Sequence, residues 1–292
     1  MRTGIVYETI LSKFDDLVER KKIFYASRKT IQTEDDGFAI EFHISPSLAK
    51  KPQNGDPVSG HEDPQAAKPE CFGPGSDIGN DDPGLLLATI NKTHLLVVNK
   101  FCMFRPQLLL LTADSYQRQK EPLDLNDFIA ACEVQSALKW KQLVIYNCGP
   151  KGGASRQHKH LQVLPRPPKL FPDGEEGVKQ KVPFRYFLRR LGDVEVEDAE
   201  GQRRLLEIYR ELLDEAKESL KGTLDEDGYI GHNVALVREW IMVIPRRNID
   251  FEGITANTAG LLGSIWMTSD EELEKWKQVG PARALSGLGV PA

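Results

Sequence analysis

The sequence has few cysteines and none in the paired spacing that holds a structural metal. Its four cysteines, Cys71, Cys102, Cys132 and Cys148, lie far apart in the chain. Wide spacing without a CxxC pair argues against a disulfide framework and against a zinc site built on cysteine pairs. We therefore expect reduced, mostly buried thiols.

Long apolar runs and an excess of positive charge are also missing. No apolar run reaches the roughly 18 residues that a membrane-crossing helix needs. The first twenty residues contain acids and show helical periodicity, unlike a signal peptide. The net charge is −5, from 38 Lys and Arg against 43 Asp and Glu, whereas duplex nucleic-acid binders have a basic face. We therefore expect an intracellular protein, cytoplasmic or nuclear, without a membrane or nucleic-acid partner.

What the chain does contain is an ordinary globular composition over 292 residues, with 40% hydrophobic and 28% charged residues. Apolar residues at helical spacing predict helices over 5–21, 124–140 and 199–220, and a Ser-x-x-Glu capping box predicts another from Ser269 to about Val279. Short or alternating apolar runs predict strands. They cover 39–44, 85–91, 94–99, 107–113, 141–147, 160–164, 232–237 and 241–244. The pattern indicates a mixed α/β chain with antiparallel hairpins.

Two glycine-rich segments interrupt these elements. Residues 51–84 contain six Gly and six Pro with few large apolar residues. This composition predicts a long loop, either a functional lid or a disordered segment. The second segment, 149–155, follows a predicted strand. A loop of this kind can direct several backbone N–H groups at a phosphate, with the Ser155 hydroxyl beside them.

The most informative residues are His158, His160 and Gln162, which are spaced two apart. Alternate residues of a strand share a face, so these side chains are predicted to form a row. Two imidazoles and an amide beside a phosphate-binding loop favour a ligand site that contains a nucleophile or base. A metal site remains an alternative, although Gln162 would be a poor third ligand. So does a surface row without function.

Taken whole, the stretch GGASRQHKHLQ resembles the fungal ATP adenylyltransferases, also called diadenosine tetraphosphate phosphorylases. They are a branch of the histidine-triad superfamily that keeps Gln where the triad hydrolases have a third His. The supporting stretches are 45–52, 94–101, 104–112, 146–149 and 240–247. The resemblance implies an α/β (α+β), histidine-triad-like fold with a mainly antiparallel sheet flanked by helices. We expect residues 1–180 to carry the HxHxQ strand and residues 181–292 to complete one compact domain.

The resemblance also implies a reaction. Inorganic phosphate would cleave diadenosine tetraphosphate reversibly to ADP and ATP, through a covalent AMP–histidine intermediate on His160. Gln162 would donate its amide to the α-phosphate, and His158 would orient the site. A divalent cation such as magnesium is expected with the substrate phosphates, without a metal held by the protein. Structural or surface roles are expected for the remaining histidines, His43, His61, His94 and His232.

The resemblance assigns a further set of residues to substrate binding. These are Lys51, Asn91, Lys92, Asn147, Gly152, Gly153, Ser155, Asn257, Thr258 and Gly260. The family usually has a lysine where this chain has Thr268. How the chain binds the distal phosphates, and which substrate it prefers, are therefore left open. Arg246, Arg247 or Lys275 are candidates to compensate. A dinucleotide hydrolase, an adenosine phosphosulfate adenylyltransferase and a catalytically dead nucleotide-binding protein remain alternatives, and the oligomeric state is open.

Overall fold

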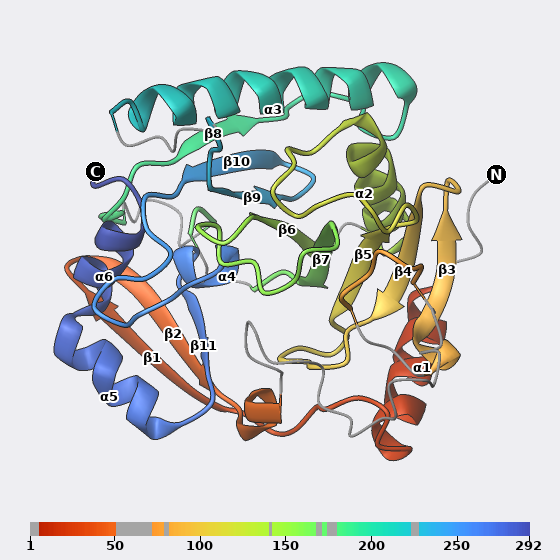
Figure 1. Ribbon diagram of the computed structural model, residues 1–292, viewed down its shortest axis with the longest axis horizontal. Helices are drawn as coiled ribbons and strands as arrows, with labels where there is room; N and C mark the ends of the chain where they lie inside the picture. The colour runs from red at the N-terminus through yellow and green to blue at the C-terminus, as the bar shows by residue number, and fades with distance from the viewer. Residues whose placement is uncertain are drawn as a thin grey trace.

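The chain folds into two β-sheets with helices packed on their outer faces (Figure 1). The computed structural model describes residues 6–50, 72–78, 82–139, 142–167, 171–173, 180–222 and 228–292. The helices are α1 (Tyr7–Glu19), α2 (Leu125–Ala137), α3 (Ala199–Ser219), α4 (Thr258–Leu261), α5 (Asp270–Val279) and α6 (Pro281–Leu288). The strands are β1 (Lys29–Asp35), β2 (Phe38–Ile44), β3 (Leu86–Ile90), β4 (His94–Val98), β5 (Leu108–Thr112), β6 (Gln142–Cys148), β7 (His160–Pro165), β8 (Phe187–Arg190), β9 (His232–Leu236), β10 (Trp240–Pro245) and β11 (Ser264–Met267).

Eight strands form one antiparallel sheet in the order β3-β4-β5-β7-β6-β9-β10-β8. The other three form a small sheet, β1-β2-β11, in which β11 runs parallel to β2. Strand β7 is interior, since Gln162 is paired with Leu109 of β5 and with Ile145 of β6. The expected architecture, a mainly antiparallel sheet flanked by helices, is confirmed.

Both faces of the large sheet are covered. One face packs against α1, α2 and α3, which contribute residues such as Phe128 and Tyr209 to the core. The other face packs against the small sheet and the C-terminal helices. Alternation along β7 divides its side chains between the two cores: Leu161 and Val163 join the helical side, and Leu164 joins the other. His160 and Gln162 therefore lie on the face turned toward the small sheet.

The predicted long helices are present, with local signals that explain their ends. Asp124 caps α2 by accepting the N–H groups of Asn126 and Asp127, and Asp198 caps α3. Helix α2 is less one-sided than its sequence predicted. Ala130 and Val134 are also buried, because this helix packs against the large sheet and against α3.

The capping box predicted at Ser269 is only half formed. The Ser269 hydroxyl accepts the N–H of Glu272 at 3.3 Å. The Glu272 carboxylate turns instead to Thr268, whose N–H (3.3 Å) and hydroxyl donate to it. The reciprocal box was therefore a wrong prediction, because Thr268 competes for the same carboxylate.

Three strands, β1, β8 and β11, were not predicted. Strand β1 has no buried residue, so its sequence lacks apolar alternation, and β8 and β11 have four residues each. The thiols of Cys102, Cys132 and Cys148 are free and buried, as predicted, whereas Cys71 and most of the 51–84 loop lie outside the described residues. Within the described ranges, no helix combines the length and apolarity required to span a membrane.

Candidate active site

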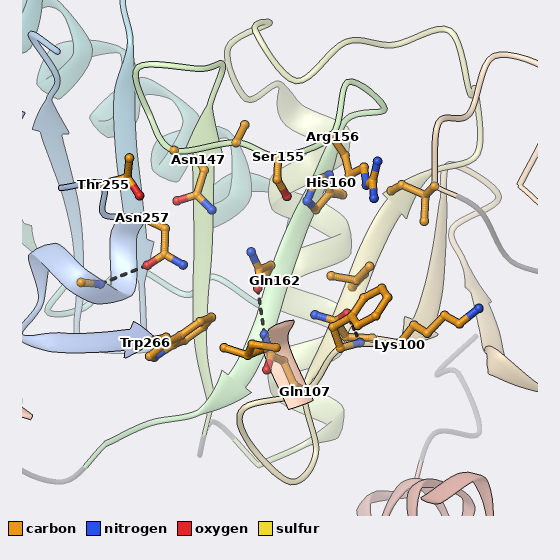
Figure 2. A pocket seen from close by; sticks show the side chains of 18 of the residues that line it. Lys100, Gln107, Asn147, Ser155, Arg156, His160, Gln162, Thr255, Asn257 and Trp266 are labelled. Carbon is orange, nitrogen blue, oxygen red and sulfur yellow. Dashed lines mark hydrogen bonds between the residues drawn. The ribbon is translucent and has the colours of Figure 1, made fainter. Parts of the chain in front are cut away.

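A cavity of about 420 Å³ opens between the two sheets beside the middle of β7 (Figure 2). Segments distant in sequence line it, including the end of β4, the end of β6, the loop before β7, and β11. The polar lining residues are Asn99, Lys100, Gln107, Asn147, Ser155, Arg156, His160, Gln162, Thr255, Asn257 and Thr268. Its volume is in the range of small-molecule sites, and polar groups of several types converge in it.

His160 is held firmly at the cavity wall. Its backbone N–H donates to the side-chain oxygen of Gln119 at 2.7 Å, and its carbonyl accepts from the Gln119 amide at 2.9 Å. The imidazole Nδ1 lies 2.8 Å from the carbonyl oxygen of His158. A carbonyl can only accept, so Nδ1 carries the proton and Nε2 carries the lone pair of the neutral ring. This is the arrangement that a nitrogen nucleophile requires.

Gln162 follows on the same face of β7. Its Oε1 accepts from the Nε2 of Gln107 at 3.0 Å, the bond drawn beside Gln162 in Figure 2. The remaining Gln162 amide nitrogen is a donor. The sequence prediction that His160 and Gln162 share one face is therefore confirmed.

His158 does not share their position. It precedes β7, is fully buried and is absent from the cavity lining. Its Nδ1 lies 2.8 Å from the Ser76 hydroxyl and its Nε2 lies 2.9 Å from the Thr112 carbonyl. Burial lowers its pKa, which favours a neutral ring that donates to Thr112. The predicted row of three side chains is thus reduced to two, and His158 reaches the site through its carbonyl.

The glycine-rich loop differs from the expected phosphate cradle. The N–H groups of Gly152, Gly153 and Ala154 donate to the backbone carbonyls of residues 148–150, at 2.9–3.2 Å. They stabilise the loop's own turns and are not directed at a ligand. Within the described residues, Ser155 makes no hydrogen bond and it lines the cavity. The end of the loop, rather than its glycines, offers donors.

The two predicted loop glycines have different positions. Gly153 lines the cavity and adopts φ +82°. Gly152 does not line the cavity. A Cβ there would lie 2.5 Å from the Cys148 carbonyl oxygen and 2.8 Å from that of His232. Gly152 therefore permits close packing of the loop on the sheet, and a side chain at this position would displace the loop.

Asn147 lines the cavity from the end of β6. Its Oδ1 accepts three donors: Asn233 Nδ2 (2.9 Å), Thr258 N (2.9 Å) and the Thr258 hydroxyl (2.7 Å). The amide is therefore oriented with its nitrogen away from this cluster, and Figure 2 shows that nitrogen on the side of Gln162. Thr258, predicted as a substrate contact, is fully buried behind Asn147 and supports it.

The cluster behind Asn147 contains a buried cation. Arg246 is 1% exposed and its Nη1 donates to Asn233 Oδ1 at 2.9 Å and to the Ala256 carbonyl at 2.8 Å. Burial lowers its pKa to about 10. Neither Arg246 nor the other two candidates for a compensating charge, Arg247 and Lys275, lines the cavity.

The C-terminal segment supplies the opposite wall. Asn257 caps α4 by accepting the Gly260 N–H at 3.1 Å, and both residues line the cavity. Thr268 also lines it, but its hydroxyl donates to Glu272. The position where the family usually has lysine thus supplies a hydroxyl whose proton is already engaged.

The structure does not bring Asn91 and Lys92 to this cavity. They form the turn before β4, whereas the cavity is lined by the opposite end of that strand and by Asn99 and Lys100 beyond it. The Asn-Lys dipeptide occurs twice in this region, and only the second copy reaches the site. Lys51 lies outside the described residues. Sequence analysis also missed Arg156, a cation on the cavity wall.

A buried ion pair lies next to His160 in the sequence. Lys159, between the two histidines, places its Nζ 2.7 Å from Asp127 Oδ2. His94 Nε2 lies 3.0 Å from the other carboxylate oxygen. The structural role predicted for His94 is therefore confirmed, since it packs β4 against α2.

The donor set of the cavity suits anionic phosphates. Its described lining contains Lys100 and Arg156, amides and hydroxyls, and no carboxylate. No group of three or more His, Cys, Asp or Glu side chains that could hold a metal ion occurs among the described residues.

Two family models match the chain. The model of the Ap4A phosphorylase N-terminal domain matches residues 19–188, and that of the ATP adenylyltransferase C-terminal domain matches residues 180–291. Two relatives from Saccharomyces cerevisiae are similar over most of the chain. Protein APA1 is 29% identical, covering 91% of this chain and 88% of its own length. Diadenosine 5',5'''-P1,P4-tetraphosphate phosphorylase 2 is 27% identical, covering 87% and 83%.

Solved structures share the fold. The crystal structure of yeast Ap4A phosphorylase Apa2 matches with a TM-score of 0.76 at 22% identity, covering 100% of this chain and 99% of that one. The Apa2 structure in complex with Ap4A matches with a TM-score of 0.75 at 22% identity and the same coverage. These matches agree with the two-sheet architecture described above.

Proposed function

The chain belongs to the Ap4A phosphorylase family, and on that premise we propose that it is an ATP adenylyltransferase that cleaves diadenosine tetraphosphate with inorganic phosphate to ADP and ATP. The reaction is reversible, because a phosphoanhydride is exchanged for a phosphoramidate in the first step and a phosphoanhydride is formed again in the second. The observation that carries the proposal is the His160 geometry: Nδ1 is fixed by the His158 carbonyl at 2.8 Å, which leaves the lone pair on Nε2.

The proposed chemistry has two displacements at one phosphorus atom. Nε2 of His160 attacks the α-phosphorus, and the bond from that phosphorus to its bridging oxygen breaks. ATP leaves with the oxygen, and AMP remains bound to His160 through a P–N bond. An oxygen of inorganic phosphate then attacks the same phosphorus, the P–N bond breaks, and ADP forms. The Nδ1–H bond to the His158 carbonyl stabilises the positive ring that forms in the first step and becomes neutral again in the second.

Neutral hydrogen-bond donors and two cationic side chains on the cavity wall support the proposed displacements at His160. The amides of Gln162 and Asn147 and the Ser155 hydroxyl are placed to donate to non-bridging oxygens as charge develops on them. Lys100 and Arg156 supply positive charge to the polyphosphate. A divalent cation such as magnesium, bound to the substrate phosphates, would neutralise part of their charge.

The apolar parts of the lining are proposed to hold the nucleosides. Lys100 and Trp266 lie on opposite sides of Gln162 in Figure 2. Val97, Leu109 and Phe72 are among the apolar residues that line the cavity. On the other side, Trp266 presents an indole whose Nε1 is bonded to Ser264 Oγ at 3.1 Å. A ring held in this way is a suitable platform for a stacked base.

The first test is product analysis with labelled phosphate. The pure protein is incubated with diadenosine tetraphosphate, magnesium and radiolabelled inorganic phosphate, in parallel with His160→Ala. We expect label in ADP for the wild type only. Unlabelled AMP with ATP would indicate a hydrolase instead, and bound dinucleotide without products would indicate a nucleotide-binding protein. Faster conversion of adenosine phosphosulfate than of the dinucleotide would favour the remaining alternative.

The second test addresses the covalent intermediate. The enzyme is mixed with a dinucleotide labelled at the α-phosphorus, without inorganic phosphate, and denatured. A phosphoramidate is stable in base and labile in acid, so wild-type protein should retain label through an alkaline wash and lose it in acid. His160→Ala should retain none. Release of ATP without any label retained on the protein would contradict the two-step mechanism.

A further inference from the structure

Gln107 lies beside the catalytic strand and has no part in the chemistry described so far. It is 2% exposed and immediately precedes β5. Its side chain bridges two groups. The backbone N–H of Met103 donates to its Oε1 at 2.7 Å, and its own Nε2 donates to Gln162 Oε1 at 3.0 Å. The Gln107 carbonyl accepts the N–H of Asn99 at 2.9 Å, which holds the residue in place.

This chain of bonds has a fixed direction. A backbone N–H can only donate, so the Gln107 atom that faces Met103 must be oxygen. The atom that faces Gln162 must then be the Gln107 nitrogen. A nitrogen that donates requires an acceptor, so Gln162 must present its own oxygen to Gln107. The Gln162 nitrogen is consequently turned away from Gln107, and Gln162 lines the cavity.

We propose that Gln107 is a positioning residue that sets the polarity of the Gln162 amide, so that Gln162 offers a donor and not an acceptor to the α-phosphoryl group. This inference rests on the proposed function, in which that group is bound at His160. A reversed Gln162 would direct a carbonyl oxygen at an anionic phosphoryl oxygen. The site would then lose a hydrogen bond and gain a repulsion, which corresponds to a rate loss on the order of ten- to a hundredfold.

Gln107→Glu is the sharpest variant. Its carboxylate still accepts the Met103 N–H, so the loop keeps that bond, but it presents a second acceptor to Gln162. The Gln162 nitrogen should then turn toward residue 107 and its oxygen toward the substrate. Gln107→Met removes the constraint without imposing the reverse orientation. We expect kcat to fall by about one order of magnitude in Gln107→Met and by more in Gln107→Glu.

A stereochemical readout separates positioning from general damage. The two diastereomers of diadenosine tetraphosphate with sulfur on the α-phosphorus differ in which non-bridging oxygen is replaced. A fixed Gln162 donor contacts one of these positions, so the wild type should prefer one diastereomer. This preference should fall toward unity in both Gln107 variants. An unchanged preference with equally reduced rates on both diastereomers would overturn the proposal.

A double-mutant cycle with Gln162→Met completes the test. If Gln107 acts through Gln162, Gln107→Glu should cause no further loss in the Gln162→Met background. Additive losses would mean that the new charge or a direct substrate contact is responsible, and would also overturn the proposal. Thermal unfolding of each variant checks that it is folded.

Failure of the proposed function gives a separate signature. It would be a wild-type enzyme that does not turn over the dinucleotide. In that case calorimetric titration with AMP still tests whether Gln107 orients Gln162. Gln107→Glu should weaken AMP binding about tenfold in the wild-type background and should not weaken it in the Gln162→Met background. Equal weakening in both backgrounds would refute it.

Discussion

Arg156 brings a guanidinium to the cavity wall without an ion pair to any described residue. A guanidinium can donate two parallel hydrogen bonds to a phosphate. We expect Arg156→Met to raise KM for the dinucleotide about tenfold, equivalent to about 1.4 kcal/mol of binding free energy, with a smaller change in kcat. Initial rates at two ionic strengths measure this, and the effect should shrink at higher salt because the lost interaction is ionic. Arg210→Met, at an exposed position on α3, is the matched control. An unchanged KM in Arg156→Met would exclude a phosphate contact.

Asn147 offers an isosteric test of donor placement. Asn147→Asp preserves an oxygen for the donors from Asn233 and Thr258 but replaces the remaining amide nitrogen with a second oxygen. We expect kcat to fall by about two orders of magnitude, as for removal of an oxyanion donor. The free energy of unfolding should change much less, because the acceptor bonds persist. A normal kcat with lowered stability would assign Asn147 a structural role only.

At the residue scale, the spacing of side chains along a strand predicted which of them share a face. The backbone hydrogen bonds of the glycine-rich loop could not be predicted in this way. The spacing of His160 and Gln162 placed them on one face, as the structure has them. The spacing rule failed for His158 because the chain is not yet a regular strand there and Ser76 binds its ring. Asn91, assigned from the resemblance, does not line the cavity, whereas Asn99 does, because identical dipeptides flank β4 and only the fold decides which end of the strand faces the cavity.

At the element scale, a buried ion pair joins the residue before β7 to helix α2. Lys159 and Asp127 are each 1% exposed, and their charged atoms lie 2.7 Å apart. Breaking such a pair leaves a buried charge, which typically costs 3–5 kcal/mol. We expect Lys159→Met to lower the free energy of unfolding by about 3 kcal/mol in urea titrations. Lys181→Met breaks the exposed pair with Asp36 and should cost less than about 1 kcal/mol. Equal effects of the two substitutions would contradict this account.

Element prediction succeeded where one face of an element is apolar. Helix α3 has a continuous buried stripe that includes Leu205, Tyr209 and Leu212, and its sequence showed the 3.6-residue period. Strand β1 has polar residues on both faces. It pairs with β2 through backbone hydrogen bonds, which no side-chain pattern predicts. The pairing of β1 could not be predicted for that reason, and β11, which lines the cavity, was missed because it has only four residues.

At the scale of the whole molecule, the site depends on two sheets meeting. The cavity lining joins residues 97–109, 147–162 and 249–268, and β11 enters the small sheet beside β2. Spacing in the sequence predicts which residues of one segment share a face. It does not predict which segments lie beside one another in the fold. The resemblance to the family assigned residues 257–260 and the HxHxQ strand to one site in advance, whereas neither the resemblance nor periodicity assigned the wall that Trp266 forms.

Buried histidines also make the stability of the whole fold depend on pH. His232 is fully buried in its neutral form: its Nδ1 donates to the Ile230 carbonyl at 2.9 Å, and its Nε2 accepts from the Tyr209 hydroxyl at 2.9 Å. Burial lowers its pKa from 6.5 to about 4. Between these values the unfolded chain binds a proton that the folded chain does not. Stability is therefore complete above pH 6.5 and decreases as the pH falls toward 4, by about 1.4 kcal/mol per pH unit.

Substitution of His232 tests this slope. The pKa of His43 is likewise lowered to about 4, chiefly by burial, so His43 adds a contribution in the same window. Burial by itself would raise the pKa of Asp127, but the His94 hydrogen bond and Lys159 hold it below 3.8, so its contribution is lost only at lower pH. Urea unfolding of wild type and His232→Gln between pH 7 and pH 4.5 should therefore give a shallower slope for the variant, even though the variant starts from a lower stability. Parallel curves would show that His232 does not titrate on unfolding, and acid sensitivity in this range would then have to arise elsewhere in the molecule.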